Sequence, residues 1–242
     1  MKISLHGELA VCISTGINIG ETIMDEKIIL TAFTDPMMGL SYESEPIMER
    51  LKQEYSELIE FRYVMSLLVR DVSDFMTPEE RRMDPESGIR KYCERLAGIY
   101  KNEEYIGGLP INMNGFCLFD ADHRSSKPLN LAYKAAHLTD PEKSETFLTE
   151  LRHATVIDCL PTTHFDEILR VVRKAGIDET SFRQYYQDGS AEKELENDLE
   201  YTHRLRIHSL PAYLIQYGKK ALIMQSFNYH EFVGAIENLI TK

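Results

Sequence analysis

The chain has 242 residues, of which 43% are hydrophobic and 27% are charged, a balance typical of a globular protein. With 27 basic and 39 acidic residues its formal charge is −12, which repels phosphate groups, so we expect neither nucleic-acid nor membrane-surface binding. No apolar run reaches the roughly 20 residues of a transmembrane helix. His6 and Glu8 interrupt the apolar core that a signal peptide needs, so we expect a cytoplasmic protein.

The first predicted elements are a strand, a helix and a second strand. Residues 27–33 are apolar and β-branched, as in a buried strand, and Asp35-Pro36 ends the run. A helix is predicted over 44–58, because an acid and a proline stand in its first turn and apolar residues recur at helical spacing. A strand over 59–69 follows. This order favours a parallel βαβ unit with a right-handed crossover.

The middle of the chain carries helical patterns and almost no strand pattern. Thr77-Pro78 followed by two glutamates is a good helix start, and Gly107-Gly108 closes that segment. A further helix is predicted to begin after Asp140. The other predicted helices span 128–137, 165–175, where Gly176 is the expected stop, and 190–205.

The end of the chain returns to β structure, with strands predicted over 212–217 and 221–225 and an amphipathic helix over 229–239. The order is therefore βαβ, a helical block, then ββα, which is the α/β layout of a thioredoxin fold with a large inserted all-helical domain. The expected parts are an N-terminal extension (1–23) with a possible extra edge strand, the first half of the fold (24–75), the inserted domain (76–200) and the second half (201–242).

Three segments resemble the DsbA-like thioredoxin-fold family, in particular its cytoplasmic branch of dithiol-disulfide isomerases. Residues 33–46, FTDPMMGLSYESEP, resemble the active-site segment, in which a strand ends in Asp-Pro and a CxxC opens the next helix. Residues 207–213, IHSLPAY, resemble the loop whose cis-proline faces that CxxC and place this proline at Pro211. Residues 125–136, SSKPLNLAYKAA, resemble the inserted helical domain. The resemblance covers roughly residues 27 to 240.

The chain departs from this family where the redox cysteines would stand, because Met38-Gly39-Leu40-Ser41 replaces the CxxC. Disulfide exchange needs a thiolate at a helix N-terminus and a second thiol that resolves the mixed disulfide. A thioether has no ionisable proton, and a hydroxyl cannot form a disulfide. The catalytic positions of the family are therefore Met38 and Ser41 here, and neither is expected to carry out exchange.

Two enzymatic alternatives remain open. The related kappa-class glutathione transferases and hydroxychromene-carboxylate isomerases use a serine at the first cysteine position, which is Met38 here, so Ser41 would have to serve if glutathione is a cofactor. The second alternative is an oxidoreductase that uses a distant cysteine. Among the cysteines, Cys12 approaches the site only if the N-terminal strand pairs beside it. The four cysteines are expected to be free thiols in the core: Cys12, Cys93, Cys117 and Cys159.

The leading hypothesis is a non-redox adaptor or peptide-binding protein. In this family the backbone before the cis-proline pairs with an extended peptide, a form of strand addition. Some cytoplasmic members deliver a regulator to a protease. The resemblance thus implies a peptide or protein partner at an exposed apolar groove around Met38, Leu210 and Pro211. The candidate contact residues are Asp35, Pro36, Met38, Ser41, Tyr42, His208, Leu210 and Pro211.

No metal site is expected. Glu150-x-x-His153 and Glu200-x-x-His203 have the spacing of di-iron bundles. In a chain rich in glutamate such pairs arise by chance, and Glu150 is expected to face solvent. The sequence contains no HExxH motif, glycine-rich phosphate loop or nucleophile elbow.

Overall fold

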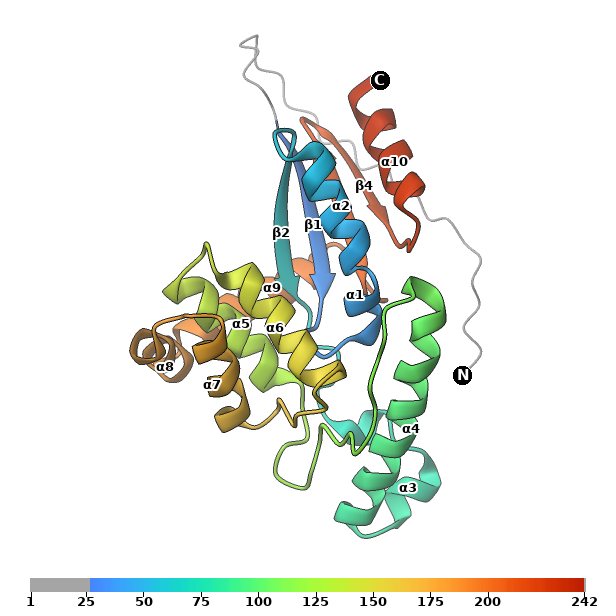
Figure 1. Ribbon diagram of the computed structural model, residues 1–242, viewed down its shortest axis with the longest axis vertical. Coiled ribbons are helices and arrows are strands. Elements are labelled where there is room, and N and C mark those ends of the chain that lie inside the picture. The colour runs from blue at the N-terminus through green and yellow to red at the C-terminus, as the bar shows by residue number, and fades with distance from the viewer. Residues whose placement is uncertain (1–26, 242) are drawn as a thin grey trace.

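The computed structural model describes residues 27–241, which form a four-stranded sheet with helices on both faces and a helical block at one end (Figure 1). The strands are β1 (Ile28–Thr34), β2 (Ile59–Met65), β3 (Ala212–Tyr217) and β4 (Lys220–Met224). The helices around the sheet are α1 (Gly39–Glu43), α2 (Glu45–Tyr55) and α10 (Tyr229–Thr241). The helices of the insertion are α3 (Pro78–Arg82), α4 (Pro85–Gly107), α5 (Lys127–Thr139), α6 (Ser144–Val156), α7 (Phe165–Lys174), α8 (Glu179–Gln187) and α9 (Ser190–Arg204).

The sheet has the strand order β2-β1-β3-β4, in which β1 and β2 are parallel and the other pairs are antiparallel. The first two strands come from the βαβ half and the last two from the ββα half, so residues more than 150 positions apart, such as Ala32 and Tyr213, pair in one sheet. The predicted thioredoxin fold with an inserted helical region is confirmed.

Alternation along the strands directs apolar side chains to two separate layers. On one face Leu30 and Tyr213 pack with Met48 of α2 and Phe232 of α10. On the opposite face Phe33, Val64 and Leu214 pack against the end of α9 and the segment that follows it. Both faces of β1 are therefore covered, as its nearly continuous apolar sequence requires.

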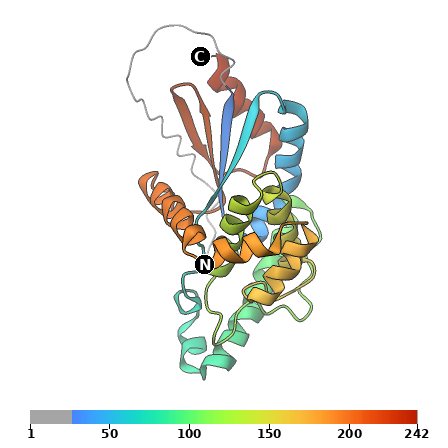
Figure 2. The ribbon, with the colours of Figure 1, turned by 90° about the vertical axis from the view of Figure 1, so that its left-hand side faces the viewer.

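The helical insertion lies at the carboxyl end of β1 in both views (Figures 1 and 2). It has its own apolar core, in which Phe147, Leu151 and Phe182 are fully buried. Met37, just before α1, and Tyr42, within α1, belong to this same core. The insertion thus meets the sheet at the place where the DsbA-like segment was predicted. No helix within residues 27–241 has the length and hydropathy needed to cross a bilayer.

Several predicted boundaries were wrong, each for a local reason. The helix predicted over 44–58 is α2, which ends at Tyr55, and a separate short helix, α1, precedes it. The two meet at Ser44, whose hydroxyl donates to the carbonyl of Ser41 (2.8 Å). The second strand ends at Met65 instead of 69, because the amides of Leu67 and Leu68 turn away from β1 and donate to side chains of Asn130 and Asp35.

The segment predicted to start a helix at Thr77 and to close at Gly107-Gly108 contains two helices. Thr77 forms a capping box with Glu80 for α3, but Asp84 then caps the Ser87 amide and starts α4. Helix α8 was not predicted, and α9 crosses the predicted domain limit at residue 200. The strand predicted within residues 9–19 and Cys12 lie outside the described residues.

Candidate functional site

The first turn of α1 holds the two residues at the predicted cysteine positions. Met38 is the N-cap of α1, and its amide donates to the carbonyl of Asp35 (3.0 Å). The Ser41 hydroxyl lies 3.9 Å from the Met38 sulfur. Only 5% of Met38 and 2% of Ser41 are exposed. The prediction of an exposed apolar contact at Met38 is therefore wrong, because the inserted helices cover this turn.

Asp35 links several segments by hydrogen bonds, and its side chain does not reach the surface. The side chain is fully buried, and one of its oxygens accepts from the Leu68 amide (2.8 Å), Ser126 (2.6 Å) and Asn130 (2.8 Å). The other oxygen accepts from the Met37 amide (3.1 Å). Burial raises the pKa of Asp35, and these hydrogen bonds oppose the rise. Asp35 and the equally buried Pro36, both candidates for ligand contact, have no open path to a ligand here.

The end of α4 covers α1, and we call this pairing the α1–α4 contact, formed by residues 37–43 and 100–110. The Tyr100 hydroxyl donates to the carbonyl of Met37 (2.5 Å), and the Tyr42 hydroxyl donates to the carbonyl of Pro110 (3.1 Å). A methyl group at Gly107 would collide with the backbone of Glu43. The two segments are therefore packed as closely as their backbones allow, and Tyr42 is a packing residue in this structure.

Two carboxyl groups are enclosed in the α1–α4 contact. Glu43 is 1% exposed, and one of its oxygens accepts from the Leu109 amide (3.0 Å). Glu103 lies against Gly39 at the start of α1, and neither Glu43 Oε1 nor Glu103 Oε2 has a hydrogen-bond partner within residues 27–241. Burial, with a further contribution from Glu43, raises the pKa of Glu103 to about 8. At neutral pH Glu103 therefore holds a proton.

Replacing Glu103 by glutamine is expected to flatten the pH dependence of stability. Between its ordinary pKa of 4.5 and about 8, folded Glu103 keeps a proton that the unfolded chain has lost. The free energy of unfolding therefore falls as pH rises through this window, by up to about 1.4 kcal/mol per pH unit, reduced by partial solvent exposure. Urea unfolding of Glu103→Gln from pH 5 to 8 should lack this component. The exposed Glu86→Gln on the same helix should retain it, and equal slopes in all three proteins would contradict the assignment.

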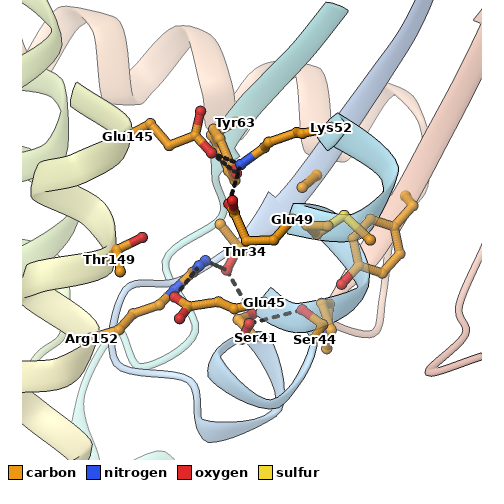
Figure 3. A pocket seen from close by; sticks show the side chains of 14 residues that line it. Thr34, Ser41, Ser44, Glu45, Glu49, Lys52, Tyr63, Glu145, Thr149 and Arg152 are labelled. Atoms are coloured by element: carbon orange, nitrogen blue, oxygen red, sulfur yellow. Dashed lines mark hydrogen bonds and ion pairs between the residues drawn. The ribbon is translucent and has the colours of Figure 1, made fainter. Parts of the chain in front are cut away.

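A small polar cavity lies between α2, the sheet and α6, next to Ser41 (Figure 3). Arg152 of α6 donates to Thr34 (3.1 Å) and to Glu45 (3.1 Å), and Thr34 donates to the Ser41 hydroxyl (2.7 Å). Lys52 forms an ion pair with Glu145 across the same space. The cavity measures about 20 Å³, room for about one water molecule. Ser41 is therefore held in a polar network that leaves little free space beside it.

The proline loop contributes the exposed part of the predicted site. The Leu210–Pro211 peptide bond is cis, and Pro211 is buried and lines the cavity near Ser41. Leu210 is half-buried, whereas His208 and Ser209 are exposed. Of the predicted contact residues, only His208 and Leu210 are therefore open to a partner in this structure.

The Glu-x-x-His pairs do not come together. Glu150 pairs with Lys174 (2.6 Å), and His153 lies 3.6 Å from Glu45. A cluster that sequence reasoning missed does form: the side chains of Asp120, His123 and His164 bring one ligand atom each within 4.8 Å. Its sequence signal is limited to the short Asp-x-x-His spacing, because His164 is the N-cap of α7, whereas Asp120 and His123 lie in the segment between α4 and α5.

The chain matches one known protein family and resembles several solved structures. Residues 32–226 match the family described as Thioredoxin. The chain belongs to this thioredoxin family. It also resembles a putative protein disulfide isomerase from Nitrosomonas europaea, with a TM-score of 0.70 at 17% identity over 88% of this chain and 98% of that one. The DsbA-like resemblance is therefore confirmed at the level of the fold.

Curated relatives of this thioredoxin-family chain carry an adaptor name. The ClpXP adapter protein SpxH of Halalkalibacterium halodurans (strain ATCC BAA-125 / DSM 18197 / FERM 7344 / JCM 9153 / C-125) is 23% identical over 86% of this chain and 66% of its own length. The protein of the same name from Shouchella clausii (strain KSM-K16) is 26% identical over 75% of this chain and 55% of its own length. The match thus spans less than two thirds of either relative.

Proposed function

We propose that this protein is a non-redox adaptor that binds a segment of another protein and presents it to a ClpXP-type protease in the cytoplasm. The observation that carries the proposal is the first turn of α1, which offers a buried thioether at Met38 and a buried hydroxyl at Ser41. Disulfide exchange at this turn would need two accessible thiols. The names of the two curated relatives support delivery to a protease.

The proposed docking surface is the proline loop, residues 205–211. His208 and Ser209 are exposed there, and Leu210 offers an apolar side chain that is half-buried. Within residues 27–241, no hydrogen bond engages the backbone of Leu210. An extended segment that adds to this loop would gain main-chain hydrogen bonds and place an apolar side chain beside Leu210.

The charge of the chain supports a basic partner segment. A formal charge of −12 attracts a segment rich in lysine or arginine over the range of a Debye length. Such steering acts mainly on the association rate, so association should slow as ionic strength rises.

The docking surface is tested by photo-crosslinking from two exposed histidine positions. A photoreactive amino acid at position 208 lies on the proline loop, and the same residue at position 230 lies at the start of α10. The proposal expects one specific protein to be captured from position 208 and not from 230, and Leu210→Glu to abolish that capture. Equal capture from both positions, or none from 208, would argue against this surface.

The glutathione alternative makes a different prediction that the same preparation can test. If Ser41 activates glutathione, thermal shift or chemical shifts should reveal binding that Ser41→Ala removes. The adaptor proposal predicts no such binding, because the cavity beside Ser41 has room for about one water molecule. Specific binding that depends on Ser41 would favour the enzymatic reading.

A further inference from the structure

Two cysteines outside the site meet at the surface of the insertion. Cys93 lies in the middle of α4 and is fully buried, and Cys117 lies in the segment between α4 and α5 and is half-buried. Both thiols donate to the carbonyl oxygen of Phe119, at 3.7 Å from Cys93 and 3.2 Å from Cys117. Because they share one acceptor, the fold brings the two free thiols close together.

This thiol pair borders an open cleft. Cys93 and Cys117 line it together with Arg90, Met113 and Phe116, and the cleft has a volume of about 600 Å³. That volume lies in the range of small-molecule sites. Because Cys117 is partly exposed and Cys93 is buried, an incoming reagent in the cleft meets Cys117 first.

The surroundings of the two thiols differ in a way that separates their roles. The neighbouring Cys93 side chain lowers the pKa of Cys117 to about 7, with smaller lowering from the Phe119 backbone and the positive charge of Arg90 and a rise from burial. The pKa of Cys93 is raised by the neighbouring Cys117 side chain and by burial. Cys117 is thus the nucleophile of the pair and Cys93 the thiol that resolves.

We propose that Cys93 and Cys117 form a reversible disulfide by exchange with a small disulfide, such as glutathione disulfide, that enters the cleft. The Cys117 thiolate attacks one sulfur of the reagent, which forms a mixed disulfide and releases one glutathione thiolate. The Cys93 thiol then loses its proton and attacks the Cys117 sulfur, which releases the second glutathione. The protein loses two electrons and two protons, and one glutathione disulfide becomes two glutathione molecules.

The proposed bond would link the body of α4 to the segment that follows it. The part of the chain between the two cysteines includes Glu103 and Pro110, which take part in the α1–α4 contact. The segment from 109 to 126 contains no helix or strand, so it can adjust as the sulfurs close to bonding distance. The proposal stands apart from the adaptor function, because it needs only the two thiols and the cleft.

The test is redox titration of the purified full chain in glutathione buffers, followed by alkylation and peptide mapping. Oxidising buffer should yield a linked Cys93–Cys117 peptide pair, two hydrogens lighter than the reduced peptides, and reducing buffer should restore both thiols. Cys93→Ser should stop at a mixed disulfide between Cys117 and glutathione, whereas Cys117→Ser should leave Cys93 reduced.

Cys159→Ser is the matched control, because Cys159 is half-buried, donates to the carbonyl of Asn112 (2.8 Å) and has a pKa raised by burial. It should form the Cys93–Cys117 link as the wild type does. Thermal unfolding of each variant checks that the fold is kept. Wild-type protein whose Cys93 and Cys117 both remain open to alkylation in oxidising buffer, or whose Cys117 stays glutathionylated without forming the link, would overturn the proposal.

Discussion

Replacing Asp35 by alanine is expected to lower the free energy of unfolding by about 3–5 kcal/mol. The change removes a buried acceptor and leaves four donors without it: the amides of Met37 and Leu68 and the side chains of Ser126 and Asn130. Those donors come from the segment between β1 and α1, the segment after β2 and the start of α5. Urea unfolding at pH 7 measures the effect.

Two comparisons sharpen this prediction. Asp35→Asn keeps one acceptor oxygen but turns an amide group towards a donor, so it should lose about 2–3 kcal/mol. Asp122→Ala, an exposed aspartate in the same insertion, should change stability by less than about 0.5 kcal/mol. A loss below about 1 kcal/mol for Asp35→Ala would mean that these hydrogen bonds do not join the sheet to the insertion.

The second large effect is expected from the ion pair that joins α5 to α9. The Lys134 ammonium lies 2.6 Å from Asp198, whose oxygen also accepts from the Met65 amide (2.7 Å), and both side chains are largely buried. Lys134→Met should cost about 3–5 kcal/mol, because it leaves the Asp198 carboxylate buried without its cation. Chemical denaturation of the purified variant provides the measurement.

An exposed ion pair between the same two helices supplies the control. Lys127 and Glu192 also bridge α5 and α9, but about two fifths of each side chain is exposed. Lys127→Met should therefore cost no more than about 1 kcal/mol. Equal losses for Lys127→Met and Lys134→Met would contradict the importance of burial.

The loss in Lys134→Met should also depend on pH. Burial raises the pKa of Asp198, and Lys134 opposes that rise, so the variant's Asp198 should titrate at a still higher pH. A carboxyl group whose pKa is raised in the folded state stabilises the protein at pH values below the group's ordinary pKa. This stabilisation is lost as pH rises. The deficit relative to wild type should therefore be larger at pH 8 than at pH 5.

The sequence was enough to predict the order of the fold. Short apolar runs at 27–33 and 212–217, with breakers after them, identify strands by local pattern alone. The Asp-Pro segment and the proline loop indicated the family. These sequence patterns are local. The folded protein keeps the predicted elements because tertiary packing favours the same structure as the local pattern.

The burial of the side chains in the Asp-Pro segment could not be predicted from that segment alone. Met38 is buried because Tyr100 and Glu103, at the far end of α4, pack over α1. Asp35 was expected near a ligand, yet three of its partners lie 33, 91 and 95 positions away in the chain. Contacts at such separations depend on the fold of the insertion, which no local pattern encodes.

The same limit explains the clusters that were missed. Cys93 and Cys117 are well separated in sequence and have no spacing typical of a redox motif, so only the fold of α4 and the following segment brings them together. The loop that carries His208 and Leu210, by contrast, could be located because its motif is continuous in sequence.

The most direct test of the adaptor proposal is the rate at which purified ClpXP degrades the protein captured from position 208. The proposal predicts that adding the wild-type chain accelerates degradation several-fold and that Leu210→Glu does not. It also predicts that Cys93→Ser, which leaves the proline loop unchanged, accelerates degradation as well as wild type does. Degradation at the same rate with and without the wild-type chain would contradict the proposal.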